Sequence, residues 1–251
     1  MDMVKKFIPA SLKLLYTVNK RSCKDLFRGH YKKFAGQFAG SQEFFPIHTI
    51  EQAIASNETT VNKIHNLGLA ISKLNNIIVR PGEVFSFWRL VGNPSQKNDY
   101  QKSRSIIGGE VEAAIGGGLC QLSGIIYFLA LHAGLRITER HAHSLDIYTE
   151  EERFTPLGSD ATVVFGYKDL RFVNPHTFVV CFSFQLTETM LKGIVSASER
   201  TEPCTIGFEY IKNNTHTDVT TIKNTNGQSV VIDRSRYVLL SSLKKSFKKI
   251  S

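Results

Sequence analysis

The stretch Ile115-Gly116-Gly117-Gly118-Leu119-Cys120-Gln121-Leu122-Ser123-Gly124 decides the fold of this chain, because it joins a glycine-rich turn to a long apolar run. From Leu119 onward the apolar residues recur at intervals of three and four, which predicts a helix with one buried face. The run ends at Ala133-Gly134, and a glycine there is a common stop signal for a helix. The sequence therefore places a buried helix at the centre of the core.

Cys120 lies in the first turn of this predicted helix and points away from its apolar face. A thiol in that position feels the positive end of the helix dipole, which favours the thiolate. The glycines before it can expose backbone N–H groups as a nest for an anion or oxyanion. We therefore predict ligand contacts at Gly116, Gly117, Gly118, Gln121 and Ser123.

Two histidines and one aspartate follow Cys120 along the chain. A strand over residues 135–143 would place His141 and His143 on one side by its alternation, and Asp160 precedes a Val- and Phe-rich segment predicted to be a strand over residues 161–167. Cysteine, histidine and carboxylate in this order are typical of transglutaminase-like and NlpC-type cysteine enzymes. The predicted catalytic set is Cys120 as nucleophile, His143 as base, His141 as the alternate base and Asp160 as the group that orients the base.

Two other interpretations of these residues stay open. In the first they are structural: a buried cysteine, histidines bonded to backbone carbonyls, and an aspartate that caps a turn. In the second Cys120, His141 and His143 bind zinc, although no second cysteine or adjacent carboxylate motif supports this site. We expect no cofactor and no metal, and whether the chain is an enzyme stays undecided at this point.

Outside this centre, the apolar patterns predict an α+β fold. Basic amphipathic helix is predicted from Phe7 to about Phe38, and a second amphipathic helix from Glu58 to Ile78. Further strands are predicted over residues 83–88, 170–173 and 178–186. Asn226-Gly227 signals a tight hairpin among the strands after Met190. We expect a basic helical arm over residues 1–57, an α+β core with the buried helix packed on an antiparallel sheet over 58–186, and a β-rich extension with a basic tail over 187–251.

Charge and cysteine content narrow the partners and the compartment. The net charge of +9 is concentrated near the two ends and favours an anionic partner, but charge alone does not distinguish a membrane surface, nucleic acid, a cell-wall precursor and a merely solvated face. We expect an anionic small-molecule or peptide ligand or a peripheral membrane contact, and no nucleic acid. No stretch approaches the ~20 apolar residues of a membrane span, and the segment after Ala10 lacks the unbroken apolar core of a secretory signal. Four scattered cysteines suit a reducing compartment, so we expect a cytoplasmic protein.

Four runs in the central part of the chain resemble the successive signature blocks of the VanW family. They are Pro81-Gly82-Glu83-Val84-Phe85-Ser86-Phe87, Gly116 to Ser123, Glu139-Arg140-His141-Ala142-His143-Ser144, and Pro156-Leu157-Gly158-Ser159-Asp160-Ala161-Thr162-Val163. The resemblance covers about residues 60 to 185. It implies a cell-wall or glycopeptide context connected with vancomycin resistance of the B type, and no established reaction.

Two hypotheses about function follow. In the first, the chain is a cysteine-dependent acyl-transfer or amide-cleaving enzyme that acts on a peptidoglycan precursor or a related peptide. In the second, it is a non-catalytic binding or scaffold protein at the membrane face, whose basic ends contact lipid headgroups. The pH at which Cys120 reacts separates the two hypotheses. Only a catalytic thiolate reacts with electrophiles at a pH well below ~8.5, the pKa of a free cysteine thiol.

Overall fold

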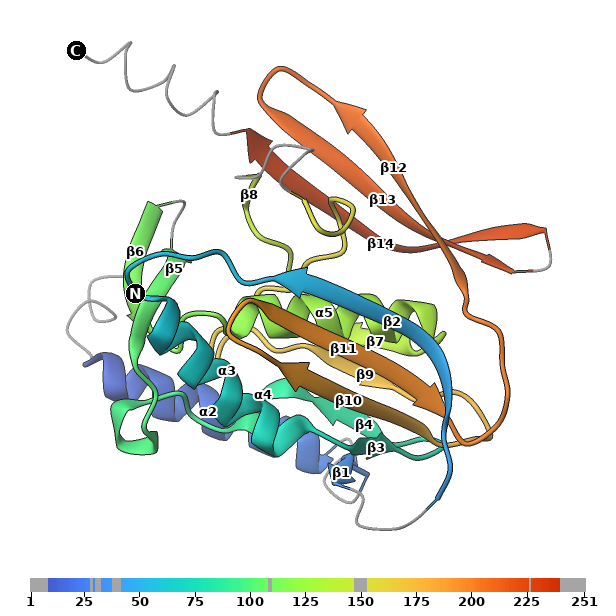
Figure 1. Ribbon diagram of the computed structural model, residues 1–251, viewed down its shortest axis with the longest axis horizontal. Coiled ribbons are helices and arrows are strands. Elements are labelled where there is room, and N and C mark those ends of the chain that lie inside the picture. The colour runs from blue at the N-terminus through green and yellow to red at the C-terminus, as the bar shows by residue number, and fades with distance from the viewer. Residues whose placement is uncertain are drawn as a thin grey trace.

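A computed structural model of the chain describes residues 9–27, 29, 33–37, 42–107, 110–146, 153–225 and 227–239. It confirms the predicted α+β class, with helices packed around antiparallel sheets (Figure 1). The helices are α2 (Ala10–Phe27), α3 (Thr60–Leu74), α4 (Phe87–Val91) and α5 (Leu119–His132), with the short 3-10 helix η2 (Gln96–Asn98). Within the described residues, no helix is long and apolar enough to cross a membrane.

The central sheet has five strands in the order β1-β3-β10-β11-β2, and every neighbouring pair is antiparallel. Its strands come from all three segments predicted from the sequence, residues 1–57, 58–186 and 187–251. Their bounds are β1 (Gly36–Gln37), β2 (Phe45–Ala53), β3 (Ile77–Val79), β10 (Val180–Leu186) and β11 (Met190–Ala197). In Figure 1, α5 lies across the face of β11 and β2.

The central helix α5 packs very closely on this sheet. A Cβ at Gly193 of β11 would come within 2.6 Å of Ile125 Cγ2, so only glycine allows the helix to approach so closely. Nearly all apolar residues of α5 are buried, and Gly134 adopts φ 68 directly after its end. The helix predicted from Leu119 with a stop at Gly134 is confirmed. The helix is apolar on most of its circumference, because it meets protein on several sides.

Three smaller sheets surround the central one. The first joins β4 (Val84–Ser86), β9 (Arg171–Val173) and β7 (Arg136–Glu139), and the second is the hairpin of β5 (Lys102–Ile107) and β6 (Glu110–Ile115). The third lies at the top right of Figure 1 and joins β12 (Thr205–Lys212), β13 (His216–Thr225), β14 (Gln228–Leu239) and β8 (Leu145–Asp146). Thr225 pairs with Gln228, which confirms the tight hairpin at Asn226-Gly227, although Asn226 itself lies outside the described residues.

Three predicted elements were wrong in extent. The strand over 83–88 ends at Ser86, because the Ser86 side chain accepts from the N–H of Arg89 and begins α4. The strand over 161–167 is absent: a single bridge joins Val164 to Lys168 around Gly166, which adopts φ 80. The helix from Phe7 is confirmed only over α2, and the basic residues 28, 30–32 and 244–249 lie outside the described residues.

A fourth wrong extent is that of the strand expected over residues 135–143. Strand β7 ends at Glu139, and the N–H of His143 donates to the Asp160 side chain at 2.8 Å instead of to a neighbouring strand. Alternation therefore does not govern the two histidines, and they turn toward different partners. This irregular segment forms the centre of the candidate site.

Candidate functional site

Cys120 stands in the first turn of α5, held there by a crowded glycine turn. Gly118 adopts φ 101, and a Cβ at Gly117 would lie 2.7 Å from the backbone of Ser103 in β5. The N–H groups of Gly116 and Gly117 already donate to Gln101 O and Ala114 O. Among the residues that the structure describes, the N–H groups of Gly118 and Cys120 have no acceptor, so only these two are available to a ligand.

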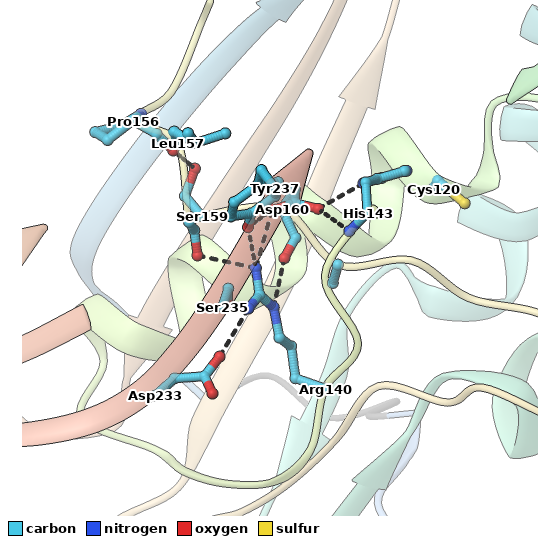
Figure 2. Close-up of polar contacts among 12 residues, drawn as sticks. Cys120, Arg140, His143, Pro156, Leu157, Ser159, Asp160, Asp233, Ser235 and Tyr237 are labelled. Carbon is cyan, nitrogen blue, oxygen red and sulfur yellow. Dashed lines mark hydrogen bonds and ion pairs between the residues drawn. The ribbon is translucent and has the colours of Figure 1, made fainter. Parts of the chain in front are cut away.

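The Cys120 thiol lies beside His143, at the meeting point of α5 and the irregular segment after β7 (Figure 2). It is half-buried, and its Sγ makes a weak contact of 3.8 Å with Val163 O. On the same helix, a Cβ at Gly124 would lie 3.7 Å from the backbone of Asp160, which is an ordinary contact distance, so the helix packs on this backbone at Gly124. The chain around Asp160 is thereby held against the helix that carries Cys120.

Asp160 holds the His143 ring from the opposite side. Its Oδ2 accepts from the His143 backbone N–H at 2.8 Å and lies 2.5 Å from the ring nitrogen Nδ1. This contact leaves Nε2 as the ring nitrogen available to Cys120. Burial opposes the charged imidazole, but the hydrogen bonds to Asp160 and Cys120 outweigh it and raise the pKa of His143 to about 10. His143 is therefore positively charged at neutral pH.

Arg140 fixes the other oxygen of Asp160. Its side chain is only 3% exposed, and its guanidinium donates to Asp160 Oδ1 at 2.9 Å and to the Asp160 carbonyl at 2.7 Å. Tyr237 Oη also donates to Asp160 Oδ1. Burial works against the carboxylate, but the hydrogen bond from His143 and the charge of Arg140 hold the pKa of Asp160 well below its ordinary value. Asp160 therefore stays ionised and keeps a fixed orientation.

The C-terminal sheet closes around Arg140. Asp233 Oδ2 accepts from Arg140 at 2.7 Å, Ser235 Oγ accepts from the same nitrogen, and both residues belong to β14. The guanidinium also donates to Gly158 O and Tyr237 Oη and lies over the Tyr127 ring of α5. Figure 2 shows Arg140 at the centre of these contacts. The C-terminal sheet thus supplies three side chains to this network, those of Asp233, Ser235 and Tyr237.

The other predicted site residues lie elsewhere or serve the packing of α5. His141 turns to Glu139, with Nε2 3.1 Å from Oε1, and its side chain is 37% exposed. Gln121 donates to Ala53 O at 3.1 Å, and Ser123 donates to Ala161 O at 2.6 Å. Of the predicted catalytic residues, the structure brings together Cys120, His143 and Asp160 and leaves His141 outside. Among the described residues, no group of three or more metal-ligating side chains could hold an ion.

The profile of one protein family, described as VanW like protein, matches residues 62–195, which is more than half of the chain. The chain belongs to the VanW family. The family predicted from the sequence blocks is thereby confirmed. No solved structure gives a significant match.

Two curated proteins are similar to this VanW chain. The vancomycin B-type resistance protein VanW of Enterococcus faecalis (strain ATCC 700802 / V583) is 36% identical over 113 residues, which cover 45% of this chain and 41% of that protein. The uncharacterized protein YoaR of Bacillus subtilis (strain 168) is 34% identical over 120 residues, or 48% of this chain and 38% of that protein. The matches therefore span less than half the length of each relative.

The VanW match contains Cys120, His143 and Asp160 but ends before β14. Sequence reasoning missed Arg140 and Tyr237. Arg140 could have been suspected, because it stands between Glu139 and His141 in one of the signature blocks. Tyr237 gave no signal, because it lies 77 residues from Asp160 in a polar strand. Only the packing of the C-terminal sheet brings it to the site.

Proposed function

We propose that this VanW protein is a cysteine-dependent acyl-transfer or amide-cleaving enzyme. The observation that carries the proposal is the placement of Cys120 beside His143, whose ring nitrogen Nδ1 is bound by Asp160. A thiol beside an imidazole that a carboxylate orients is the arrangement of activated cysteine nucleophiles. In this proposal Cys120 attacks, His143 carries the proton, and Asp160 fixes the tautomer and the orientation of the ring.

The raised pKa of His143 suits an ion pair with a negatively charged sulfur at neutral pH. In the proposed first step, the sulfur of Cys120 forms a bond with the carbonyl carbon of the substrate. As the carbon–nitrogen bond breaks, His143 gives the proton on Nε2 to the leaving amine. Water or an acceptor amine then attacks the thioester, loses its proton to His143 and releases Cys120.

The free N–H of Cys120 supports the same proposal. It lies in the first turn of α5, where the helix dipole favours negative charge. None of the described residues accepts a hydrogen bond from it. A tetrahedral intermediate formed on Cys120 would place its oxyanion near this group. Gln121 does not contribute in this proposal, because its amide nitrogen is bonded to Ala53.

The proposed substrate is a peptide amide in a peptidoglycan precursor or a related peptide. This part rests on the similarity to the protein of Enterococcus faecalis, which is named for vancomycin B-type resistance. The context that we propose for this chain is accordingly the cell wall. The cytoplasmic location expected from the cysteine content stays a prediction.

Site-resolved labelling tests the proposal. The full chain is treated with iodoacetamide over a range of pH, and the labelled peptides of Cys120 and of the exposed Cys23 are quantified separately. We expect Cys120 to react at pH values well below ~8.5, while Cys23 follows the profile of an ordinary thiol. His143→Ala should give Cys120 the ordinary profile, and Cys23 should not change.

Intact-mass analysis with an activated peptide thioester provides the second readout. A covalent acyl adduct should form on the native protein and be absent from Cys120→Ala. An ordinary labelling profile together with no adduct would contradict catalysis. The glycine turn and His143 would then fit the alternative, a non-catalytic protein that binds an anionic or peptide ligand.

A further inference from the structure

Helix α2 has one face docked on the protein. Leu14 and Val18 lie against Gly166, where a Cβ would come within 2.5 Å of Leu14 Cδ1. Arg21 donates to Glu139 at 2.5 Å, and Asp25 accepts from Arg171 at 2.6 Å. At ~100° per residue, these side chains fall on one side of the helix. The helix is therefore fixed to the body by both apolar contacts and ion pairs.

The opposite face of α2 exposes a stripe of large apolar side chains, which we call the α2 stripe. Its members and their exposed fractions are Leu12 (54%), Leu15 (56%), Tyr16 (67%), Leu26 (62%) and Phe27 (89%). Their spacing places them within one third of the helix circumference, about opposite Arg21, with Leu12, Leu15 and Tyr16 near one end of the helix and Leu26 and Phe27 at the other. Large apolar side chains gathered on one exposed face of a folded protein mark an interaction surface.

The charges of α2 identify the kind of partner. Lys13, Lys20 and Lys24 lie along one flank of the stripe, and Lys20 Nζ lies 5.8 Å from the centre of the Tyr16 ring. Asp25 is the only carboxylate of the helix, and it is buried in its pair with Arg171. The exposed side of α2 therefore combines apolar and aromatic side chains with positive charge and presents no negative charge.

We propose that α2 lies flat on an anionic lipid surface, with the α2 stripe buried at the boundary between headgroups and acyl chains. Leucine and phenylalanine side chains supply the apolar contact, Tyr16 suits the interface, and the three lysines reach the anionic headgroups. The ion pairs of Arg21 and Asp25 would hold the rest of the protein to the helix in one orientation. This surface is independent of the chemistry proposed for Cys120.

A second copy of this chain fits the stripe less well. In a symmetric dimer the same patch meets itself, so two sets of three lysines would gather without a carboxylate from either helix. Such like charges weaken the contact. Anionic headgroups supply the missing negative charge, and the bilayer supplies the apolar environment. The lipid surface is therefore the partner that matches both properties.

Vesicle co-sedimentation of the full chain tests the proposal. We expect binding to phosphatidylcholine vesicles that contain phosphatidylglycerol, and weaker binding to phosphatidylcholine alone or at high salt. The triple variant Leu15→Ser, Leu26→Ser, Phe27→Ser should lower the partition coefficient on the order of 100-fold. Replacing Lys13, Lys20 and Lys24 by Gln should remove the preference for the anionic vesicles.

The matched control replaces three apolar residues that are exposed on the C-terminal sheet. Ile211→Ser, Val230→Ser, Val231→Ser removes side chains of similar exposure and should bind vesicles as the native chain does. Failure of the native chain to bind anionic vesicles would overturn the proposal, as would equal binding by the triple α2 variant. A dimer in sedimentation that the α2 variant abolishes, with vesicle binding unchanged, would assign the stripe to a second copy.

Discussion

Arg140 and Arg171 are both buried arginines that gather carboxylates, yet their networks end in different places. Arg140 is 3% exposed and binds Asp160 and Asp233, and from Asp160 the contacts continue to His143 and Cys120. Arg171 is 16% exposed and binds Asp25 and Asp169. From Asp169 the contacts continue to Ser86 Oγ and the N–H of Trp88, at the start of α4.

This difference shows that a buried ion-pair network is not by itself a sign of a functional site. The Arg171 network docks α2 and shapes a turn, and its contacts are bonds to backbone groups and to other charged side chains. The Arg140 network has the same chemistry, but it also orients a histidine that lies beside a half-buried thiol. The two networks differ in the groups at which their contacts end: a histidine beside a thiol in the Arg140 network, and the start of α4 in the Arg171 network.

Replacing each arginine should separate the two roles and gives the largest expected effect. Arg140→Leu removes the cation of Asp233 and one of the two cations of Asp160, and Arg171→Leu removes the cation of the buried Asp25 and Asp169. Each change should lower the free energy of unfolding by about 3–5 kcal/mol. Urea unfolding measures this loss. Only Arg140→Leu should also move the labelling profile of Cys120 toward that of an ordinary thiol. An equal change of this profile in Arg171→Leu would contradict the separation.

The pH dependence of stability sharpens the comparison further. The pKa of His143 rises from an ordinary 6.5 to about 10, so its stabilisation is fully present below pH 6.5 and is lost as the pH rises through 10. The native chain should therefore lose on the order of a few kcal/mol over this range, and His143→Gln should lose much less. Urea unfolding at a series of pH values measures both slopes.

His132 provides the control for this pH experiment. Burial and the charge of the neighbouring His48 lower the pKa of His132 to about 4, so it stays neutral between pH 6.5 and 10. His132→Gln should therefore keep the native slope, whatever it does to stability overall. If His143→Gln and the native chain gave parallel curves, His143 would not carry a charge that depends on Asp160.

The parts of the fold that the sequence predicted are those governed by local patterns. The helix around Cys120 was clear because its apolar side chains repeat along a single element, and the hairpin at Asn226-Gly227 was clear because its turn residues are specific. The strand over 161–167 was wrong although its composition suited a strand. Its backbone bonds elsewhere: Thr162 N donates to His141 O, and Ala161 O accepts from Ser123.

The sequence predicted only those residues of the candidate site whose side chains would take part in the proposed chemistry themselves. Cys120, His143 and Asp160 could be proposed from their order along the chain, and the structure brings them together. The two histidines could not be ranked by alternation, because the strand ends before either of them. Tyr237 could not be found at all, because its contact with Asp160 depends on how a distant sheet packs.

The smallest effect is expected at His141, which the sequence analysis named as the alternate base. His141 is 37% exposed and binds Glu139, which keeps Arg21 and the N–H of Asp169 as partners when the imidazole is removed. His141→Asn should therefore change the free energy of unfolding by less than about 1 kcal/mol, since exposed ion pairs contribute little. Labelling of Cys120 across pH should stay native, whereas His143→Asn should abolish its low-pH reactivity. If His141→Asn instead removed that reactivity and His143→Asn did not, His141 would be the histidine that controls the thiol. The Arg140 network would then be structural, like that of Arg171.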